Sequence, residues 1–217
     1  MATIKIKIAD LIIEVEESSN DLGLFDKYLV DNNLNSNFIV SSNNIDKEHI
    51  DIHNQIAEKL PLYNGFLIHG AAIAYKNKAY IFIAPSGTGK TTHIKYWAKH
   101  INDLIIINGD KPIVRNINNQ NYVYGSPWSG KEGLNSNVSI PLDSIIILKR
   151  GLTDEIKEVD PKEYINDILR QVYIPANKNS LSLTITLINS LFENIKTYEL
   201  YCTNSDSAFY TCFKGLV

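Results

Sequence analysis

The chain has 217 residues, a formal net charge of -3 at pH 7 and 44% hydrophobic residues. This length allows one substantial core, or a core domain with a small appendage. The slightly acidic balance gives no reason to expect nucleic-acid binding, which depends on clustered Lys and Arg. Cys202 and Cys212 have no cluster of His or Cys around them in the sequence, so we expect reduced thiols rather than a zinc site or a disulfide.

The start of the chain does not have the pattern of a secretion signal. Residues 1–8 alternate apolar and polar or charged side chains and lack the uninterrupted apolar stretch of a signal peptide. No later apolar run approaches the roughly 20 residues that a membrane span needs. These patterns predict a cytoplasmic protein with neither a membrane nor a nucleic acid as partner, and they do not indicate its oligomeric state.

The first 60 residues are predicted to form a small N-terminal β-rich subregion. Residues 3–8 alternate with period two and a second apolar run follows at 11–15, which is typical of a β-hairpin or meander. Residues 18–44 are rich in Asn and Ser and predict no defined element. A helix is expected over 46–60, with Asp46 as its N-cap.

Residues 61–217 are predicted to form an α/β core in which strands and helices follow one another. Two apolar strands, 66–75 and 79–84, are separated by a turn in which Asn77 tolerates positive φ. A helix at 91–101 and a short apolar strand at 104–107 come next. The later predicted elements are strands at 122–124 and 145–148, a helix from Asp160 to about Tyr173, a helix at 177–195 and a last strand at 197–202. This order favours an α/β (α+β mixed-sheet) fold.

Residues 84–91, here called the Gly-rich loop, match the phosphate-binding pattern except that Ala84 replaces the first glycine. An apolar strand enters the loop and a helix leaves it, as phosphate binding by backbone amides and a helix N-terminus requires. Lys90 is expected to reach the β- and γ-phosphates, and the hydroxyl of Thr91 to ligate magnesium. The predicted nucleotide-binding residues are Pro85, Ser86, Gly87, Thr88, Gly89, Lys90, Thr91 and Thr92.

Three further side chains are candidates for the chemistry. Asp110 directly follows a predicted strand that we expect to adjoin the strand before the Gly-rich loop, at the edge where ligands bind; alternatively it is an ordinary turn residue. His69 is either functional or a hydrogen-bonded core residue. The segment 125–133 has glycines suited to a mobile cover, and Lys131 in it could neutralise phosphate charge, or Lys131 is a surface charge and Trp128 a core anchor. Arg150 and Arg170 are weaker candidates for the same role.

Taken together, His69-Gly70, the hairpin that leads into the Gly-rich loop, and Asn108-Gly109-Asp110 resemble the HPr kinase/phosphorylase family. That family is related to ATP-dependent phosphoenolpyruvate carboxykinases, and the likeness is to its short stand-alone kinases of modified-peptide pathways, including lasso-peptide precursor kinases. It covers residues 66–115 well and the remainder only in element order. The resemblance implies a P-loop core of the HPr kinase/phosphoenolpyruvate carboxykinase type.

The resemblance also implies residue roles. In the family a histidine precedes the phosphate loop, and two adjacent aspartates follow the next strand, one associated with magnesium and one with deprotonation of the acceptor hydroxyl. His69 and Asp110 match by position, whereas Gly109 stands where the other aspartate is expected. Asp110 is therefore expected to act as the base, as the magnesium ligand, or as both at different steps.

The sequence thus predicts a magnesium-dependent kinase that uses ATP, with GTP not excluded, and phosphorylates a Ser or Thr hydroxyl. The expected acceptor, a small protein or precursor peptide, follows from the resemblance alone. Two other readings stay open. A kinase for a free metabolite would need a small closed pocket, and Gly109 favours a module that binds nucleotide without turnover.

Overall fold

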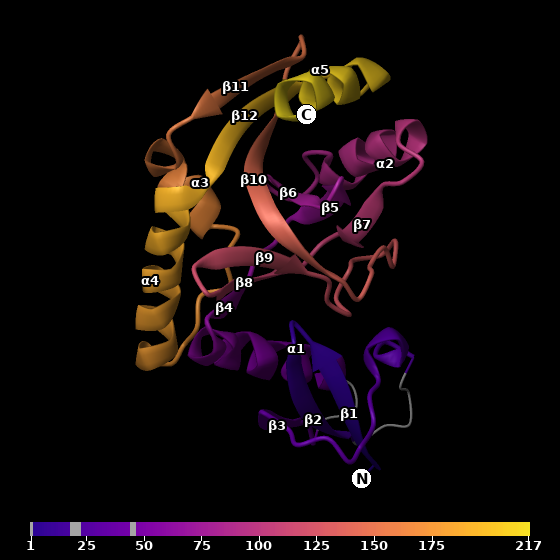
Figure 1. Cartoon of the computed structure of the whole chain (residues 1–217), viewed down its shortest axis with the longest axis vertical. Coiled ribbons are helices and arrows are strands. Elements are labelled where there is room, and N and C mark those ends of the chain that lie inside the picture. Colours follow the sequence, from indigo (N-terminus) through magenta and orange to yellow (C-terminus); the bar gives the residue numbers. More distant parts are fainter. Residues whose placement is uncertain (1, 18–22, 44–46) are drawn as a thin grey trace.

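The computed structural model of the protein describes residues 2–17, 23–43 and 47–217 (Figure 1). The N-terminal part holds a three-stranded sheet of β1 (Ala2–Ile8), β2 (Leu11–Glu17) and β3 (Phe38–Ser41). The predicted hairpin is confirmed, because β1 and β2 pair antiparallel through a turn at Ala9 and Asp10. β3 pairs parallel with β2 in a segment for which the sequence predicted no defined element.

The predicted first helix is α1 (Glu48–Lys59), followed by a 3-10 turn, Leu60–Tyr63. Lys47 is its N-cap, and the predicted cap Asp46 lies outside the described residues. α1 packs its apolar side chains into a cluster that also contains residues of the large sheet. The N-terminal part therefore shares a continuous hydrophobic core with one end of that sheet, and the proposed division at residue 60 stays a prediction.

A curled mixed sheet of nine strands forms the centre of the molecule (Figure 1). The long strand β10 (Ser139–Arg150) joins its two parts: residues 139–141 pair with β9, and residues from Leu142 onward pair with β6 and β12. A register shift between Leu142 and Ser144 marks the transition. The other strands are β4 (Gly65–Leu67), β5 (Ala71–Tyr75), β6 (Lys78–Ile83), β7 (Ile105–Asn108), β8 (Ile113–Ile117), β9 (Gln120–Tyr124), β11 (Glu155–Val159) and β12 (Lys196–Cys202).

The single strand predicted at 66–75 is wrong, because the chain changes partners in its middle. β4 pairs with β8, whereas β5 pairs with β6 and β7. Between them the backbone amides of Ile68, His69 and Gly70 donate to the carbonyls of Pro112, Gln171 and Asp110. An apolar run alone does not show such a change of partner, because both strands are buried.

Helices cover the two faces of the upper part of the sheet. One face packs against α3 (Ile165–Leu169) and α4 (Lys178–Asn194), and the other against α2 (Lys90–His100) and α5 (Asp206–Leu216) (Figure 1). The predicted cap Asp160 is confirmed, since its side chain accepts a hydrogen bond from the Lys162 amide at 2.9 Å. The helix that follows ends at Leu169, before the predicted Tyr173. Among the described residues, no helix has the length and apolar character that a membrane crossing requires.

The direction of the strands brings several chain segments to one edge of the sheet. β6, β10 and β12 are mutually parallel, and β7 runs the same way because β6 and β7 are both antiparallel to β5. Four carboxyl ends and the amino end of β5 therefore meet at this edge. The expectation that β7 adjoins β6 is wrong, since β5 lies between them.

A buried carboxylate on β12 should make the stability of the fold depend on pH. Glu199 is 1% exposed. Burial raises its pKa, but hydrogen bonds from Lys149, Lys157 and Tyr164 outweigh burial and lower the pKa from 4.5 to about 2. Because the folded pKa lies below the unfolded one, this carboxylate stabilises the fold above pH 4.5, and its contribution disappears as the pH falls to about 2.

We expect Glu199→Gln to lower the free energy of unfolding at pH 7 by about 2 kcal/mol, because both lysines lose their partner while staying partly in water. At pH 3 the deficit should be clearly smaller. Urea unfolding at the two pH values measures it, with the exposed Glu193→Gln on α4 as control. An equal deficit at both pH values would show that the loss comes from packing and not from the charge.

Candidate functional site

The Gly-rich loop joins β6 to α2 at the sheet edge described above. Gly87 has φ 77° and Gly89 has φ 122°, and a Cβ at either position would meet no atom within 4 Å. Backbone conformation, not lack of space, therefore requires glycine there. Gly89 is the N-cap of α2 and gives no side-chain cap, so the first amides of the helix are available to an anion.

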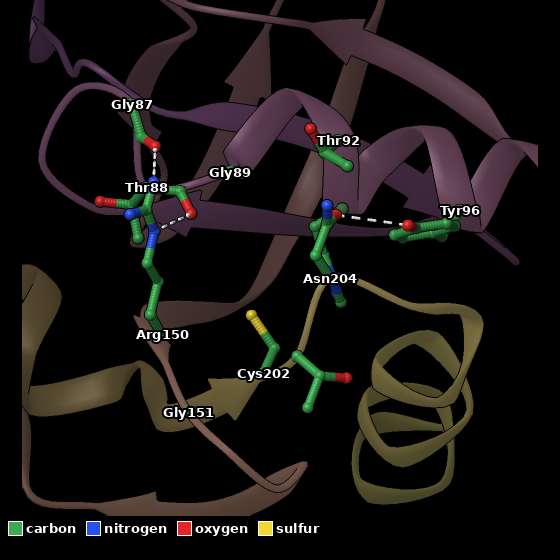
Figure 2. A pocket seen from close by; sticks show the side chains of 11 residues that line it. Gly87, Thr88, Gly89, Thr92, Tyr96, Arg150, Gly151, Cys202 and Asn204 are labelled. Carbon is green, nitrogen blue, oxygen red and sulfur yellow. Dashed lines mark hydrogen bonds between the residues drawn. The ribbon is translucent and has the colours of Figure 1, made fainter.

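Side chains hold the carbonyl groups of this loop. Arg150, at the end of β10, donates from Nη2 to the carbonyl of Gly87 at 2.6 Å and from Nε to that of Thr88 at 3.5 Å (Figure 2). The hydroxyl of Thr88 donates to the carbonyl of Pro85 at 2.8 Å. A loop that binds phosphate through its amides must keep its carbonyls from the anion. Arg150, a weaker candidate from sequence, thus contacts the loop directly.

Lys90 is buried inside the loop and donates from Nζ to the carbonyl of Ala84 at 2.8 Å. Burial lowers its pKa, and the charge of Asp110 acts in the opposite direction. A second, longer contact joins Nζ to the Pro85 carbonyl at 3.5 Å. An ammonium group that has lost water and has neutral carbonyls as partners is well placed to gain from an incoming phosphate. The contact of Lys90 with the β- and γ-phosphates stays a prediction.

Asp110 and His69 meet at the same edge. Asp110 follows β7 and His69 precedes β5, and His69 Nε2 lies 3.3 Å from Asp110 Oδ1. The hydrogen bond from His69 lowers the pKa of Asp110, although burial raises it in part. Asp110 is therefore a carboxylate at neutral pH, able to accept a proton or to ligate a cation.

The backbone on either side of Asp110 is fixed by Asn108, which is completely buried. Its Oδ1 accepts from the amides of Asp110 at 2.8 Å and Lys111 at 2.7 Å, and its Nδ2 donates to the carbonyl of Ser126 at 2.9 Å. A side chain that uses both ends of its amide in this way holds the turn rigid. Asn108 belongs to the motif noted in the sequence but was not predicted as a site residue.

Gly109 has a packing reason to be glycine. A Cβ there would lie 3.2 Å from the carbonyl oxygen of Ser129 and 3.4 Å from the Cβ of Leu134. The Gly109 amide donates to the Leu134 carbonyl at 2.8 Å. The segment 129–134 thus packs against the position at which the resemblance led us to expect a second aspartate.

Segment 125–133 lies beside Asp110, because a Cβ on Gly130 would be 3.2 Å from the Cβ of Asp110. Trp128 packs edge-on against His53 of α1, with ring centroids 4.8 Å apart, which supports its reading as a core anchor. Lys131 is exposed and does not line the cavity around Asp110. Its catalytic role stays a prediction. Arg170 is likewise exposed, at the end of α3.

Most of the predicted residues, but not Pro85, Thr88 or Lys131, line one cavity of about 260 Å³. It is lined by His69, Ser86, Gly87, Gly89, Lys90, Thr91, Thr92, Gly109 and Asp110. Pro85 and Thr88 lie on the outer side of the loop, in a hollow shared with Arg150. Within the described ranges, no group of three or more His, Cys, Asp or Glu could hold a metal ion. A cation here would therefore depend on Thr91, Asp110 and oxygens of its ligand.

The sequence did not point to Gln171, which holds His69 from behind. Gln171 accepts from the His69 amide through its carbonyl at 2.7 Å, and its Oε1 lies 2.9 Å from His69 Nδ1. The second contact fixes the ring and, with it, the nitrogen that faces Asp110. Gln171 follows a short helix and carries no motif, so only the tertiary contact reveals it.

For the phosphotransfer that the sequence predicts, we expect Gln171→Leu to lower kcat about tenfold, which corresponds to the loss of roughly one hydrogen bond, with KM for nucleotide little changed. Gln171→Glu keeps an acceptor at Nδ1 and should recover most of the rate. Steady-state kinetics across a pH series measures both variants. If Gln171→Leu and Gln171→Glu lose activity equally, the residue supports the fold and does not orient His69.

Comparisons with known proteins give a distant structural likeness. No protein-family model matches the sequence, and no curated protein matches it. Among solved structures, the chain is similar to the HPr(Ser) kinase/phosphatase from Coxiella burnetii, with 13% sequence identity and a TM-score of 0.30. The similarity covers 57% of this chain and 93% of that chain. At this identity and TM-score the likeness carries no information about a reaction.

Proposed function

We propose that the protein is a magnesium-dependent kinase that transfers the γ-phosphoryl group of ATP to a Ser or Thr hydroxyl of a small protein or precursor peptide. The observation that supports this most directly is that Lys90, Thr91 and Asp110 line one cavity beside the Gly-rich loop. Phosphoryl transfer needs a cation for the phosphates, a metal site and a group that orients the acceptor hydroxyl. GTP remains an alternative donor.

The residues present fit a magnesium ion. Magnesium prefers oxygen ligands and is usually held by one or two carboxylates together with phosphate oxygens. The hydroxyl of Thr91 and the carboxylate of Asp110 are such donors, and both line the cavity. When bound, the ion would neutralise charge on the β- and γ-phosphates.

The chemistry of this chain's own side chains then follows. The acceptor oxygen attacks the γ-phosphorus, the bond to the β–γ bridging oxygen breaks, and ADP leaves. Asp110, ionised at neutral pH, takes the proton of the acceptor hydroxyl, and His69 holds its other side. Lys90 balances the charge that develops on the phosphate oxygens.

The accessibility of this pair is compatible with a large acceptor. The side chains of His69 and Asp110 are 33% and 31% exposed. A hydroxyl on a peptide can therefore reach Asp110 from the surface, whereas a free metabolite would gain little from so open a site. This favours the peptide acceptor over the metabolite.

Incubation with magnesium-ATP and peptides encoded by neighbouring genes, followed by intact-mass measurement, tests the proposal. A gain of one phosphate on a Ser or Thr, located by fragmentation, is the expected result. Formation of ADP with a phosphorylated free metabolite, and none with any peptide, would refute the acceptor class.

One observation favours a second function, a module that binds nucleotide without turnover. The segment 129–134 packs against Gly109 and leaves one carboxylate where the resemblance implies two. In this case magnesium-ATP should bind, raise the melting temperature and be recovered unchanged after long incubation with every peptide.

A further inference from the structure

A second cavity, which Asp110 does not line, lies against the Gly-rich loop (Figure 2). Its volume is about 310 Å³, within the range of small-molecule sites. The loop and α2 form one wall, and the ends of β10 and β12 form the other. Gly87, Gly89 and Thr92 line both cavities, so the two spaces meet at the loop.

The order of strands at the sheet edge places the two cavities in line. Along this edge come the end of β7 with Asp110, the start of β5 with His69, the Gly-rich loop after β6, and then the ends of β10 and β12. A ligand whose phosphates lie in the loop, with its terminal phosphate toward Asp110, must extend its other end toward β10 and β12. The second cavity opens there.

The lining of this cavity suits a flat, uncharged group with hydrogen-bonding edges. Tyr96 offers an aromatic ring, and its hydroxyl donates to Asn204 Oδ1 at 3.3 Å, which leaves the amide NH₂ of Asn204 to bond a ligand. Figure 2 shows the sulfur of Cys202 directed into the space between Arg150 and Asn204. Arg150 lines the same cavity and donates to the Gly87 carbonyl, so it adds positive charge where the loop borders this space.

We infer that this cavity binds the nucleoside half of the nucleoside triphosphate, with base and ribose against Tyr96, Cys202 and Asn204. The inference rests on the proposed function, because it takes the phosphates to lie in the Gly-rich loop. It adds that the affinity for ATP beyond that for inorganic tripolyphosphate comes from the ends of β10 and β12.

Labelling of the cysteines tests this in the unmodified protein. Cys202 is partly exposed and faces the cavity, whereas Cys212 is completely buried and serves as the internal control. Burial raises the pKa of Cys202 to about 11, so methyl methanethiosulfonate is applied near pH ~9, where more thiolate forms. Magnesium-ATP at ten times its Kd should slow modification of Cys202 about tenfold. Magnesium tripolyphosphate at the same saturation should leave the rate unchanged.

The outcomes separate the two proposals. If ATP and tripolyphosphate both bind and compete but neither protects Cys202, the nucleoside lies elsewhere and the inference is overturned, while the phosphate site stands. If neither ATP nor tripolyphosphate binds, the proposed function and the inference both fail. Protection by tripolyphosphate equal to that by ATP also overturns the inference, because the loop alone would account for it.

A matched pair of variants provides a second measurement. Cys202→Phe fills the cavity and should weaken ATP binding at least about tenfold, with tripolyphosphate affinity unchanged. Ser190→Phe places the same side chain at an exposed position on α4 outside the cavity and should bind both ligands as the native protein does. Circular dichroism melting checks that both variants fold. If Cys202→Phe melts as the native protein does and still binds ATP with native affinity, the inference is overturned.

Discussion

Asp110→Asn should reduce phosphotransfer by about 10²- to 10⁴-fold, the usual contribution of a general base. Asparagine has nearly the same size as aspartate and can still hydrogen-bond to His69, but it accepts no proton from the acceptor hydroxyl. The affinity for magnesium-ATP should stay within about threefold, because the asparagine Oδ1 can still ligate magnesium and Lys90 and the loop amides remain in place. Single-turnover assays and calorimetric titration measure the two quantities separately.

Asp103→Asn is the matched control for Asp110→Asn. Asp103 is exposed in the turn that follows α2 and precedes β7, so it carries the same change of charge outside the cavity. Its activity and nucleotide affinity should equal those of the native protein. Equal loss of binding and turnover in Asp110→Asn would contradict the role as base and leave Asp110 with a role at the metal alone. Unchanged turnover would remove it from the site.

The elements that the sequence predicted well depend on local signals. The turn at Asn77 is confirmed, with φ 60°, because a two-residue turn of positive φ is specified by the residues that form it. The helix predicted at 177–195 is α4, since Asn177 caps it through the amides of Asn179 and Ser180 and one face of the helix is buried. Turns and helix caps of this kind are specified by residues adjacent in the sequence, so they can be predicted without knowledge of the fold.

Features that depend on distant contacts were missed. The strand β8 has a buried Ile113 and Val114 followed by partly exposed residues, so its short pattern is ambiguous without its partners β4 and β9. The insertion of β5 between β6 and β7 is a matter of pairing that periodicity does not encode. Pairing choices of this kind decide which strand ends share an edge.

The candidate site likewise has one part that the sequence predicts and another part that only contacts between distant residues reveal. The Gly-rich loop is contiguous in sequence, so its residues were identified by spacing. Gln171 lies 102 residues from His69, and Arg150 lies 63 residues from Gly87, so no spacing rule connects them. Cys202 was read as an ordinary thiol, because nothing in the sequence places the end of β12 beside the loop.

Lys90→Met should remove most of the stabilisation that magnesium-ATP gives to the native protein. Nζ lies inside the loop, 2.8 Å from the Ala84 carbonyl, where it can meet the phosphates. A ligand at 100 times its Kd adds about 2.7 kcal/mol to stability, and most of this gain should be lost with the charge. Without nucleotide the variant should melt close to the native temperature. Burial lowers the pKa of Lys90 because it disfavours the charged ammonium, and an uncharged side chain of similar length avoids this cost of burying a charge.

Thermal melting with and without magnesium-ATP measures this, and Lys99→Met is the matched control. Lys99 lies on the same helix but is exposed and pairs with Asp206 at 2.5 Å, so its loss should leave the nucleotide-induced shift intact. Lys90→Met and Asp110→Asn are then complementary, since the first should lose binding and turnover together and the second turnover alone. A full nucleotide-induced shift in Lys90→Met would mean that the phosphates lie outside the Gly-rich loop, and Asp110 would lose its place beside the γ-phosphoryl group.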